Sequence, residues 1–247
     1  MSKLKAVILA AGKGTRMNSD LPKVVHKCNG QPMVHYVIKA AKDAGAYDVC
    51  VIVGYKAKEV KASIYDVVEY AEQAEQLGTG HAVKCAKEFI GTEGDTIVLC
   101  GDTPLITGET LNALVEMHRK QANGVTVLSA ILDDATGYGR IIRDADNNFM
   151  KIVEQKDATE EEKQVKEVNS GMYIFNSEAL SASLELLSSN NAAGEYYLTD
   201  TIALIKKIGL KVSAMPVTGD KVNEILGVNT VEQLHTAELI MKGRKEQ

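Results

Sequence analysis

A group of basic residues and two glycines follows the first apolar segment of the chain. The basic residues lie close together in the sequence, and they are Lys13, Arg16 and Lys23. The one acidic residue between them is Asp20. Gly12 and Gly14 allow backbone N–H groups to approach a ligand closely, and several N–H groups turned inward bind anions. This combination favours a polyphosphate ligand over a neutral one.

The spacing of these glycines differs from that of two common phosphate-binding loops. A Walker A loop needs G-x-x-x-x-G-K-[S/T], and the dinucleotide fingerprint needs a third glycine three residues after the second. Neither pattern is present at Gly12 and Gly14. We therefore expect a different kind of phosphate loop. The alternative is that the glycines only shape a strand-to-helix turn while the basic side chains are solvated.

Strands of a parallel sheet must position this loop. Apolar runs occur at residues 5–10, 48–53, 96–100 and 125–132, and segments with helical periodicity separate them. This alternation is typical of an α/β protein whose sheet is covered on both faces. Ligands of such sheets bind at the carboxyl ends of the strands, where the first loop begins. From residue 133 onward, shorter alternating segments at 136–141 and 149–154 predict strands beside the ligand rather than further βαβ units.

Helical periodicity and end signals predict the remaining elements. The helices are expected at residues 32–44, 59–65, 79–89, 107–121, 202–208 and 231–242, with an edge strand at 67–70 and a short strand at 211–217. Thr230 and Gln233 form a capping-box pattern at the start of the last helix. The charge run at 160–163 is interpreted as a solvated surface without a function.

Two further segments are expected at the same end of the sheet. Asp102 directly follows the apolar run 96–100, where a carboxylate can hold a divalent cation near a phosphate. The alternative is a turn or capping aspartate. Residues 72–81 form a polar loop with two glycines that opens a helix, so N–H donors and carboxamides are available to a nucleobase. The alternative here is an ordinary connecting loop.

Composition excludes several classes of partner. The chain has 247 residues, 45% of them hydrophobic, and a formal net charge of −5. No basic stripe is present, which argues against a nucleic-acid partner. The apolar runs are too short to span a membrane, and the N-terminal residues 1–5 show no signal-peptide core, so we expect a cytoplasmic protein without a membrane partner.

Cysteine and histidine spacing indicates neither a zinc site nor a redox motif. The four cysteines contain no C-x-x-C pair, and the five histidines show no metal-ligand spacing. Cys50 and Cys100 lie in apolar runs and are interpreted as small core residues.

Four motifs together resemble a known family. Residues 9–17 (L-A-A-G-K-G-T-R-M) with L-P-K at 21–23 resemble the signature of the sugar-1-phosphate nucleotidyltransferases. The loop at 72–81, G-D-T-P-L at 101–105 and G-V-N at 227–229 resemble one branch of that family. It is the uridyltransferase half of the bifunctional N-acetylglucosamine-1-phosphate uridyltransferase/glucosamine-1-phosphate acetyltransferases. The resemblance covers nearly the whole chain, and it implies a Rossmann-like, mostly parallel sheet with a sugar-binding lobe in the second half.

The resemblance also implies roles for particular residues. It makes Arg16 and Lys23 catalytic, and it makes Asp102 and Asn229 the protein ligands of Mg²⁺. The residues that it places against the nucleotide or phosphates are Leu9, Ala10, Ala11, Gly12, Lys13, Lys23, Gln73, Gln76, Gly78, Thr79 and Asn229. Those that it places around the sugar are Gly139, Glu154, Asn169, Tyr197 and Thr199. Several relatives have an aromatic residue where this chain has Cys100, so a ring contact to the sugar is expected to be missing.

The implied reaction joins UTP and N-acetyl-α-glucosamine 1-phosphate to give UDP-N-acetylglucosamine and pyrophosphate. The sugar phosphate oxygen attacks the α-phosphorus in line, which requires positioning and charge neutralisation but no covalent enzyme intermediate. One alternative is the same chemistry with another substrate, such as glucose 1-phosphate or dTTP. Another is a nucleotide-sugar-binding module that has lost turnover.

The resemblance sets an expectation for domain organisation. We expect a nucleotidyltransferase unit at 1–229 and a C-terminal helix at 230–247. The bifunctional relatives continue into a β-helix of short repeats that carries the acetyltransferase and most trimer contacts, and no such repeat occurs before Gln247. The chain is therefore expected to lack acetyltransferase activity and to be a monomer or a weak dimer.

Overall fold

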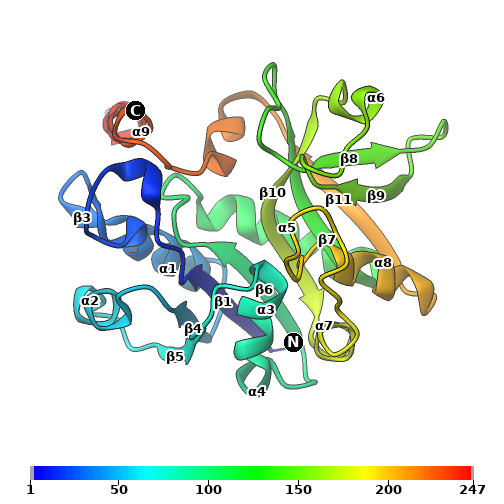
Figure 1. Cartoon of the computed structure of the whole chain (residues 1–247), viewed down its shortest axis with the longest axis horizontal. Coiled ribbons are helices and arrows are strands. Elements are labelled where there is room, and N and C mark those ends of the chain that lie inside the picture. Colours follow the sequence, from blue (N-terminus) through cyan, green and yellow to red (C-terminus); the bar gives the residue numbers. More distant parts are fainter. Residues whose placement is uncertain (1–2, 246–247) are drawn as a thin grey trace.

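The computed structural model describes residues 3–245, so the outer ends of the two expected units lie outside the described residues. Within them, nine strands form one sheet (Figure 1). The strand order is β11, β7, β10, β6, β1, β4 and β5, and β8 and β9 extend the sheet beside β10. The bounds are β1 Leu4–Ala10, β4 Asp48–Val53, β5 Glu69–Glu72, β6 Asp95–Cys100, β7 Asn123–Ile131, β8 Arg140–Arg143, β9 Phe149–Val153, β10 Glu167–Asn176 and β11 Lys211–Val217. A separate two-stranded ribbon pairs β2 (Lys27–Cys28) with β3 (Gln31–Pro32).

The sheet is mostly parallel, which confirms the expected fold class. Parallel pairs join β1 to β4 and β6, β4 to β5, and β7 to β11. Strand β10 runs antiparallel to both β6 and β7 and lies between them. It therefore divides the sheet into a first half (β6, β1, β4 and β5) and a second half (β10, β7, β11, β8 and β9). The sequence predicted strands after residue 133 but not a central antiparallel strand.

Helices cover both faces of the sheet, because β1 has buried apolar side chains on both of its faces. Ile8 of β1 packs into one apolar cluster and Val7 into the other, because successive side chains of a strand point to opposite faces. Helices α1 and α5 bury apolar residues on the first face, and α3, α4, α7 and α8 do so on the second. Their bounds are α1 Met33–Asp43, α3 Thr79–Cys85, α4 Lys87–Ile90, α5 Gly108–Gln121, α7 Ser177–Leu184 and α8 Asp200–Lys207.

Several predicted elements differ from the structure. The strand expected at 136–141 starts only at Arg140 and ends at Arg143 (β8). The helix expected at 79–89 is interrupted at Ala86, whose ψ of 13° leaves the helical region, and the chain then turns so that Lys5 Nζ donates to the carbonyl of Ile90 at 2.8 Å. Helix α2 spans Ala57–Ser63 rather than 59–65. The edge strand lies at Glu69–Glu72 rather than 67–70, because its parallel pairing with β4 starts at Cys50 opposite Glu69.

The last helix, α9, spans Val231–Lys245 and packs away from the sheet. Its residues Ala237 and Met241 share a small apolar cluster with Cys28 and Met33. It packs against β2, and in Figure 1 it lies close to the blue loops near the start of the chain. Among the described residues, no helix has both the length and the apolar character needed to cross a membrane. A short helix, α6 (Glu160–Lys163), carries the predicted charge run, and none of its residues is buried.

Candidate active site

Gly14 allows the first loop to fold against Lys23. Its φ is +67°, in the left-handed region that favours glycine. A Cβ at this position would lie 2.5 Å from Cβ of Lys23, so any side chain here would displace the lysine. The tight turn expected from the sequence therefore occurs at Gly14, and the close approach seen here is to Lys23, whereas the approach of backbone N–H groups to a ligand stays a prediction.

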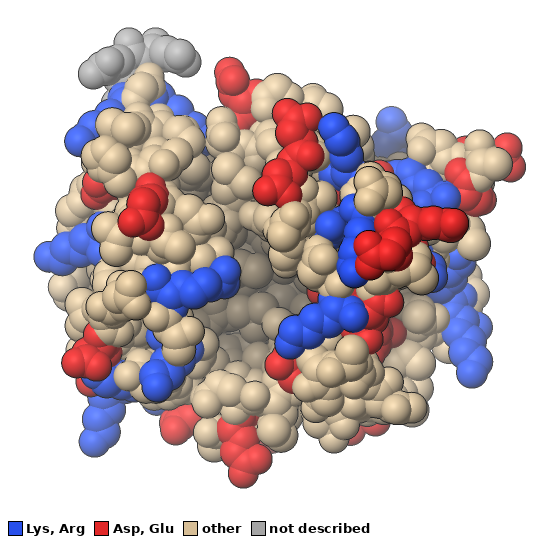
Figure 2. All heavy atoms as spheres, turned by 45° about the horizontal axis from the view of Figure 1, so that its top comes forward, with Lys and Arg blue, Asp and Glu red and all other residues tan. Residues whose placement is uncertain are grey.

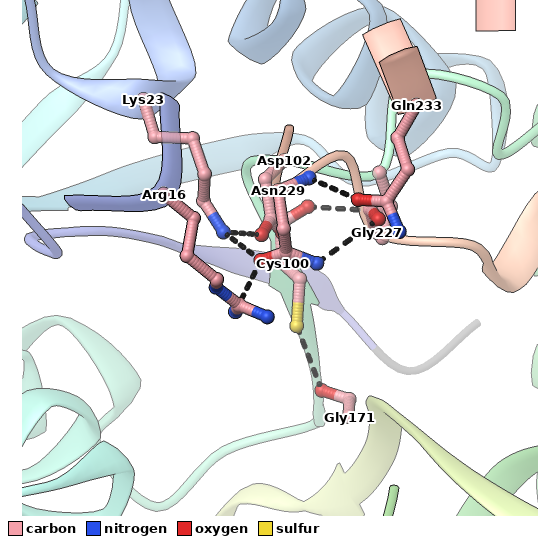
Figure 3. A network of polar contacts seen from close by, with 9 residues as sticks. Arg16, Lys23, Cys100, Asp102, Gly171, Gly227, Asn229 and Gln233 are labelled. Carbon is pink, nitrogen blue, oxygen red and sulfur yellow. Dashed lines mark hydrogen bonds and ion pairs between the residues drawn. The ribbon is translucent and has the colours of Figure 1, made fainter. Parts of the chain in front are cut away.

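Lys23, Asp102 and Asn229 meet at the carboxyl end of β1 and β6 (Figure 3). The Lys23 ammonium forms an ion pair with the Asp102 carboxylate and donates to Asn229 Oδ1 at 2.8 Å. Arg16 donates from Nη2 to the same Asn229 oxygen, also at 2.8 Å. The Lys23 and Asp102 side chains have exposed fractions of only 17% and 18%, so solvent screens their attraction less than that of a surface pair. Four residues predicted from separate motifs are thus brought together.

The backbone around Asn229 fixes the direction of its carboxamide. Val228 donates its N–H to the carbonyl of Asp102 at 2.8 Å, which ties this loop to the end of β6. Asn229 Nδ2 donates to the carbonyl of Gly227 at 3.1 Å, and this bond turns Oδ1 toward Lys23 and Arg16. The oxygens of Asp102 and Asn229 therefore face the same cation.

This oxygen pair is suited to a hard divalent cation. Such ions prefer carboxylate and carboxamide oxygens, and Mg²⁺ keeps several waters or phosphate oxygens besides a few protein ligands. The Lys23 ammonium lies against both oxygens, so the position already accommodates positive charge. Across residues 3–245, no three His, Cys, Asp or Glu side chains gather as an all-protein metal site. A metal at Asp102 and Asn229 would complete its shell from substrate phosphates and water.

Two adjoining cavities open beside this network, and the corresponding face of the molecule is hollowed at its centre (Figure 2). The first, of about 370 Å³, and the second, of about 250 Å³, share Cys100 and Asp102 as walls. The predicted residues that line the first are Leu9, Ala10, Ala11, Gly12, Lys23, Gln73, Gln76, Gly78 and Thr79. Arg16 and Asn229 line the second. Lys13 lines neither of them, and its Nζ lies 5.6 Å from the centroid of the Tyr55 ring.

The loop predicted to contact a nucleobase is held by its own side chains. Gln73 is buried, and its Nε2 donates to the carbonyl of Gly78 at 3.0 Å and lies 3.1 Å from His81 Nδ1. Thr79 Oγ1 accepts from the N–H of Leu198 at 3.1 Å, which attaches the start of α3 to the segment before α8. These bonds fix the shape of the loop, and His81 takes part in holding it.

The residues predicted to surround a sugar gather in the second half of the sheet. Thr199 Oγ1 donates to Glu154 Oε1 at 3.0 Å, and a Cβ on Gly139 would lie 3.3 Å from Glu154 Oε2. Asn169 donates its N–H to the carbonyl of Gly139 at 2.9 Å and its Nδ2 to the hydroxyl of Tyr173 at 2.7 Å. Unlike Arg16, none of these residues lines either of the two cavities.

Burial and neighbouring acids make this second group electrostatically distinct. Burial raises the pKa of the Glu154 carboxyl above its ordinary value, the hydrogen bond from Thr199 opposes this, and Asp200, Asp157 and Glu195 add to the rise. The pKa of Tyr197 is raised to about 12, first by burial and then by Asp157. The phenol therefore stays neutral, and the group forms an acidic patch apart from the Lys23 network.

Cys100 was predicted as a core residue, and the structure corrects this. Its side chain lines both cavities, and Sγ donates to the carbonyl of Gly171 at 3.4 Å. Gly171 in turn donates its N–H to Asn169 Oδ1 at 3.0 Å, so Cys100 connects the end of β6 beside Asp102 to Asn169. Burial, and then Asp102, raise its pKa to about 12, which keeps it a thiol. The sequence contained one signal for this position, because Cys100 is the last residue of the apolar run and lies two residues before Asp102. Cys50, by contrast, is buried as expected.

Tyr138 and Gln233 line the second cavity and were not predicted to do so. Burial, and then Asp102, raise the pKa of Tyr138. Gln233 appeared in the sequence only as part of a capping pattern. Its Oε1 accepts the N–H of Asn229 at 2.7 Å, a contact that sequence spacing alone did not indicate.

Comparison with known proteins identifies the family and agrees with the fold. The sequence pattern of the nucleotidyl transferase family matches residues 5–219, and the chain belongs to that family. It is 53% identical over 244 residues to the bifunctional protein GlmU of Caldanaerobacter subterraneus subsp. tengcongensis, which covers 99% of this chain and 53% of that protein. The bifunctional protein GlmU of Clostridioides difficile is 51% identical over 97% of this chain and 52% of its own length. The chain thus spans about half the length of these curated relatives, and the resemblance seen in the sequence is confirmed.

A solved structure supports the fold alone. A Bacillus anthracis protein described as a glucose-1-phosphate thymidylyltransferase, in complex with sucrose, superposes with a TM-score of 0.77. The superposition covers 96% of this chain and 94% of that one, at 22% sequence identity.

Proposed function

We propose that this chain is a uridyltransferase that converts UTP and N-acetyl-α-glucosamine 1-phosphate into UDP-N-acetylglucosamine and pyrophosphate. The observation that carries the proposal is the meeting of Arg16, Lys23, Asp102 and Asn229 at one end of the sheet. Relatives named GlmU, about half identical over nearly the whole chain, support the choice of substrates.

The Lys23 network is suited to phosphoryl chemistry by positioning and charge. Arg16 and Lys23 would bind the phosphates of UTP and stabilise the charge that develops as the sugar phosphate oxygen attacks the α-phosphorus. Pyrophosphate leaves in the same step, so no protein nucleophile is required. Asp102 and Asn229 would hold Mg²⁺, which supplies further neutralisation of the phosphate charge when it is bound. Lys13, which lies farther out over Tyr55, would assist at the triphosphate.

The two cavities suggest how the substrates are arranged. The first would receive the nucleotide, with its base against the loop of Gln73, Gln76, Gly78 and Thr79. Because both hydrogens of the Gln73 amide are directed at Gly78 and His81, its Oε1 is the atom that can accept from a base. The residues that would contact the N-acetylglucosamine are Gly139, Glu154, Asn169, Tyr197 and Thr199.

A substrate panel with pyrophosphate readout tests this function. UTP and dTTP are each combined with N-acetylglucosamine 1-phosphate and glucose 1-phosphate, with Mg²⁺, Mn²⁺ or a chelator present. We expect the highest specificity constant for UTP with N-acetylglucosamine 1-phosphate and Mg²⁺, and no turnover with the chelator. A higher constant for another pair would contradict the substrate assignment. Binding of UDP-N-acetylglucosamine without any turnover would instead favour a nucleotide-sugar-binding module.

Three other expectations stay predictions. They are the cytoplasmic location, which was drawn from the composition, and the unit boundary at residue 229 and the monomer or weak dimer, which were drawn from the resemblance. Sedimentation over a range of concentrations tests the last of these. A concentration-independent trimer would show that this chain carries an interface of its own.

A further inference from the structure

Gln233 makes an unusual capping contact at the start of α9. Its own N–H donates to Thr230 Oγ1 at 3.2 Å, which is one half of a capping box. In a capping box the side chain at this position accepts from the N–H of the capping residue itself, here Thr230. Gln233 Oε1 instead accepts from the N–H of Asn229, one residue earlier, at 2.7 Å (Figure 3).

Helix α6 of the same chain provides a direct comparison. There Glu162 donates its N–H to Thr159 Oγ1 at 3.2 Å and accepts from the N–H of Thr159 at 2.9 Å, which is the complete box. The N–H of Thr159 belongs to a residue with no place in the site. At α9 the same kind of contact is displaced by one residue, and its donor is the backbone of Asn229.

The hydrogen bond to Gln233 is one of three that hold the segment around Asn229 in place. The loop before α9 is tied to β6 by the bond from Val228 to the Asp102 carbonyl, and the Asn229 carboxamide is turned by its bond to Gly227. The N–H of Asn229 also forms a hydrogen bond, to Gln233 Oε1, and this bond fixes the backbone of Asn229 itself. Gln233 lines the second cavity, but its acceptor oxygen is directed at Asn229 rather than at a ligand.

We infer that Gln233 is a positioning residue that holds Asn229 Oδ1 in the place from which it binds the metal, and this rests on the proposed function. Partners that orient a ligand typically change metal affinity by about 10- to 100-fold when they are removed. Gln233 lies at the exposed start of a helix, so its replacement is expected to leave the chain folded. Its role is therefore separable from a role in folding.

Three variants distinguish positioning from capping. Gln233→Leu removes the acceptor at similar size, and Gln233→Glu keeps an acceptor oxygen. Thr230→Ala removes the other capping contact of the same helix and leaves the Asn229 bond in place. Each is titrated with Mn²⁺ in the presence of UTP, with free Mn²⁺ followed by electron paramagnetic resonance, and each is also unfolded thermally.

The expected result is a weakening of Mn²⁺ binding by about 10-fold or more in Gln233→Leu. Gln233→Glu should bind within a few-fold of wild type, and Thr230→Ala should bind as wild type even where its unfolding temperature falls. Wild-type affinity in Gln233→Leu would overturn the inference. Equal weakening in Thr230→Ala would do so too, because capping alone would then explain the effect.

Asn229→Ala separates this inference from the proposed function. If Asn229→Ala weakens Mn²⁺ binding and Gln233→Leu does not, the metal site stands and only the role of Gln233 is overturned. If Asn229→Ala leaves Mn²⁺ binding unchanged, the metal assignment in the proposed function fails, and the role of Gln233 fails with it.

Discussion

The two sides of the cleft differ in charge and in how their polar groups are held. On the side of the first half of the sheet, Arg16 and Lys23 converge on Asp102 and Asn229, so basic groups face the space where phosphates are expected. On the side of the second half, the carboxyl of Glu154 is buried among other acids and accepts a hydrogen bond from a hydroxyl.

This difference indicates how a sugar phosphate is oriented. A phosphate is attracted by the basic side and repelled by the acidic side, whereas neutral sugar hydroxyls can donate to a carboxylate. The substrate would therefore enter with its phosphate toward Lys23 and its ring toward Glu154. Hydrogen bonds from Thr199 to Glu154 and from Asn169 to Tyr173 hold the side chains of the acidic side in place, which limits the side-chain ordering that would oppose binding.

The largest effect is expected on the basic side. Lys23→Ala should lower turnover by about 10²- to 10³-fold, because a preorganised donor to the charge of the transition state is typically worth that much. Lys27→Ala, which removes an exposed lysine from the nearby strand β2, is the matched control and should retain wild-type turnover. Steady-state kinetics of pyrophosphate release measure both variants. A change in Michaelis constants at unchanged turnover would show that Lys23 only binds substrate.

An intermediate effect is expected on the acidic side. Glu154→Gln should raise the Michaelis constant for the sugar phosphate by about 10-fold, because a hydrogen bond to a charged group is replaced by a neutral one. The Michaelis constant for UTP should stay the same. Glu160→Gln, in the exposed helix α6, serves as the control. Equal increases for both substrates would remove the distinction between the two sides of the cleft.

The smallest effect concerns stability and pH. Burial, and then the neighbouring acids, raise the pKa of Glu154 in the folded chain above 4.5, against the bond from Thr199. Between 4.5 and the raised value the folded chain binds more protons than the unfolded chain, so this group lowers stability as pH rises. The stability of Glu154→Gln relative to wild type should therefore increase from about pH 4 to about pH 7. Denaturant unfolding at both pH values checks this, and a relative stability that falls over that range would contradict it.

The sequence predicted those parts of the fold whose signals are local. Strands β4 and β11 have the predicted bounds, and β1 and β6 differ by one residue. For β1, β4 and β6 the reason is that buried parallel strands appear as continuous apolar runs. The central position of β10 was not predicted, since it depends on antiparallel pairing with β6 and β7 far along the chain. The break at Ala86 was not predicted either, because no glycine or proline marks that position in the sequence.

For the site, residue types indicated a phosphate loop and an acid near it, whereas the pairing of Asp102 with Asn229 came from the resemblance. Spacing could not have revealed it, because the two residues are joined only through tertiary contacts at the end of β6. The contact of Gln233 with Asn229 could not be predicted from the sequence for a different reason. A capping pattern in the sequence does not specify which of two neighbouring N–H groups the side chain will accept from.

The position of the Lys23 ammonium has a consequence for metal binding. The ammonium pairs with Asp102 and donates to Asn229, so a divalent ion that bound both oxygens would have to displace it. The metal affinity would then report a competition between two cations for one pair of oxygens, and each cation would weaken the binding of the other by the same factor. Under the proposed function, the displaced ammonium would lie beside the phosphates, so metal binding would also make Lys23 available to them.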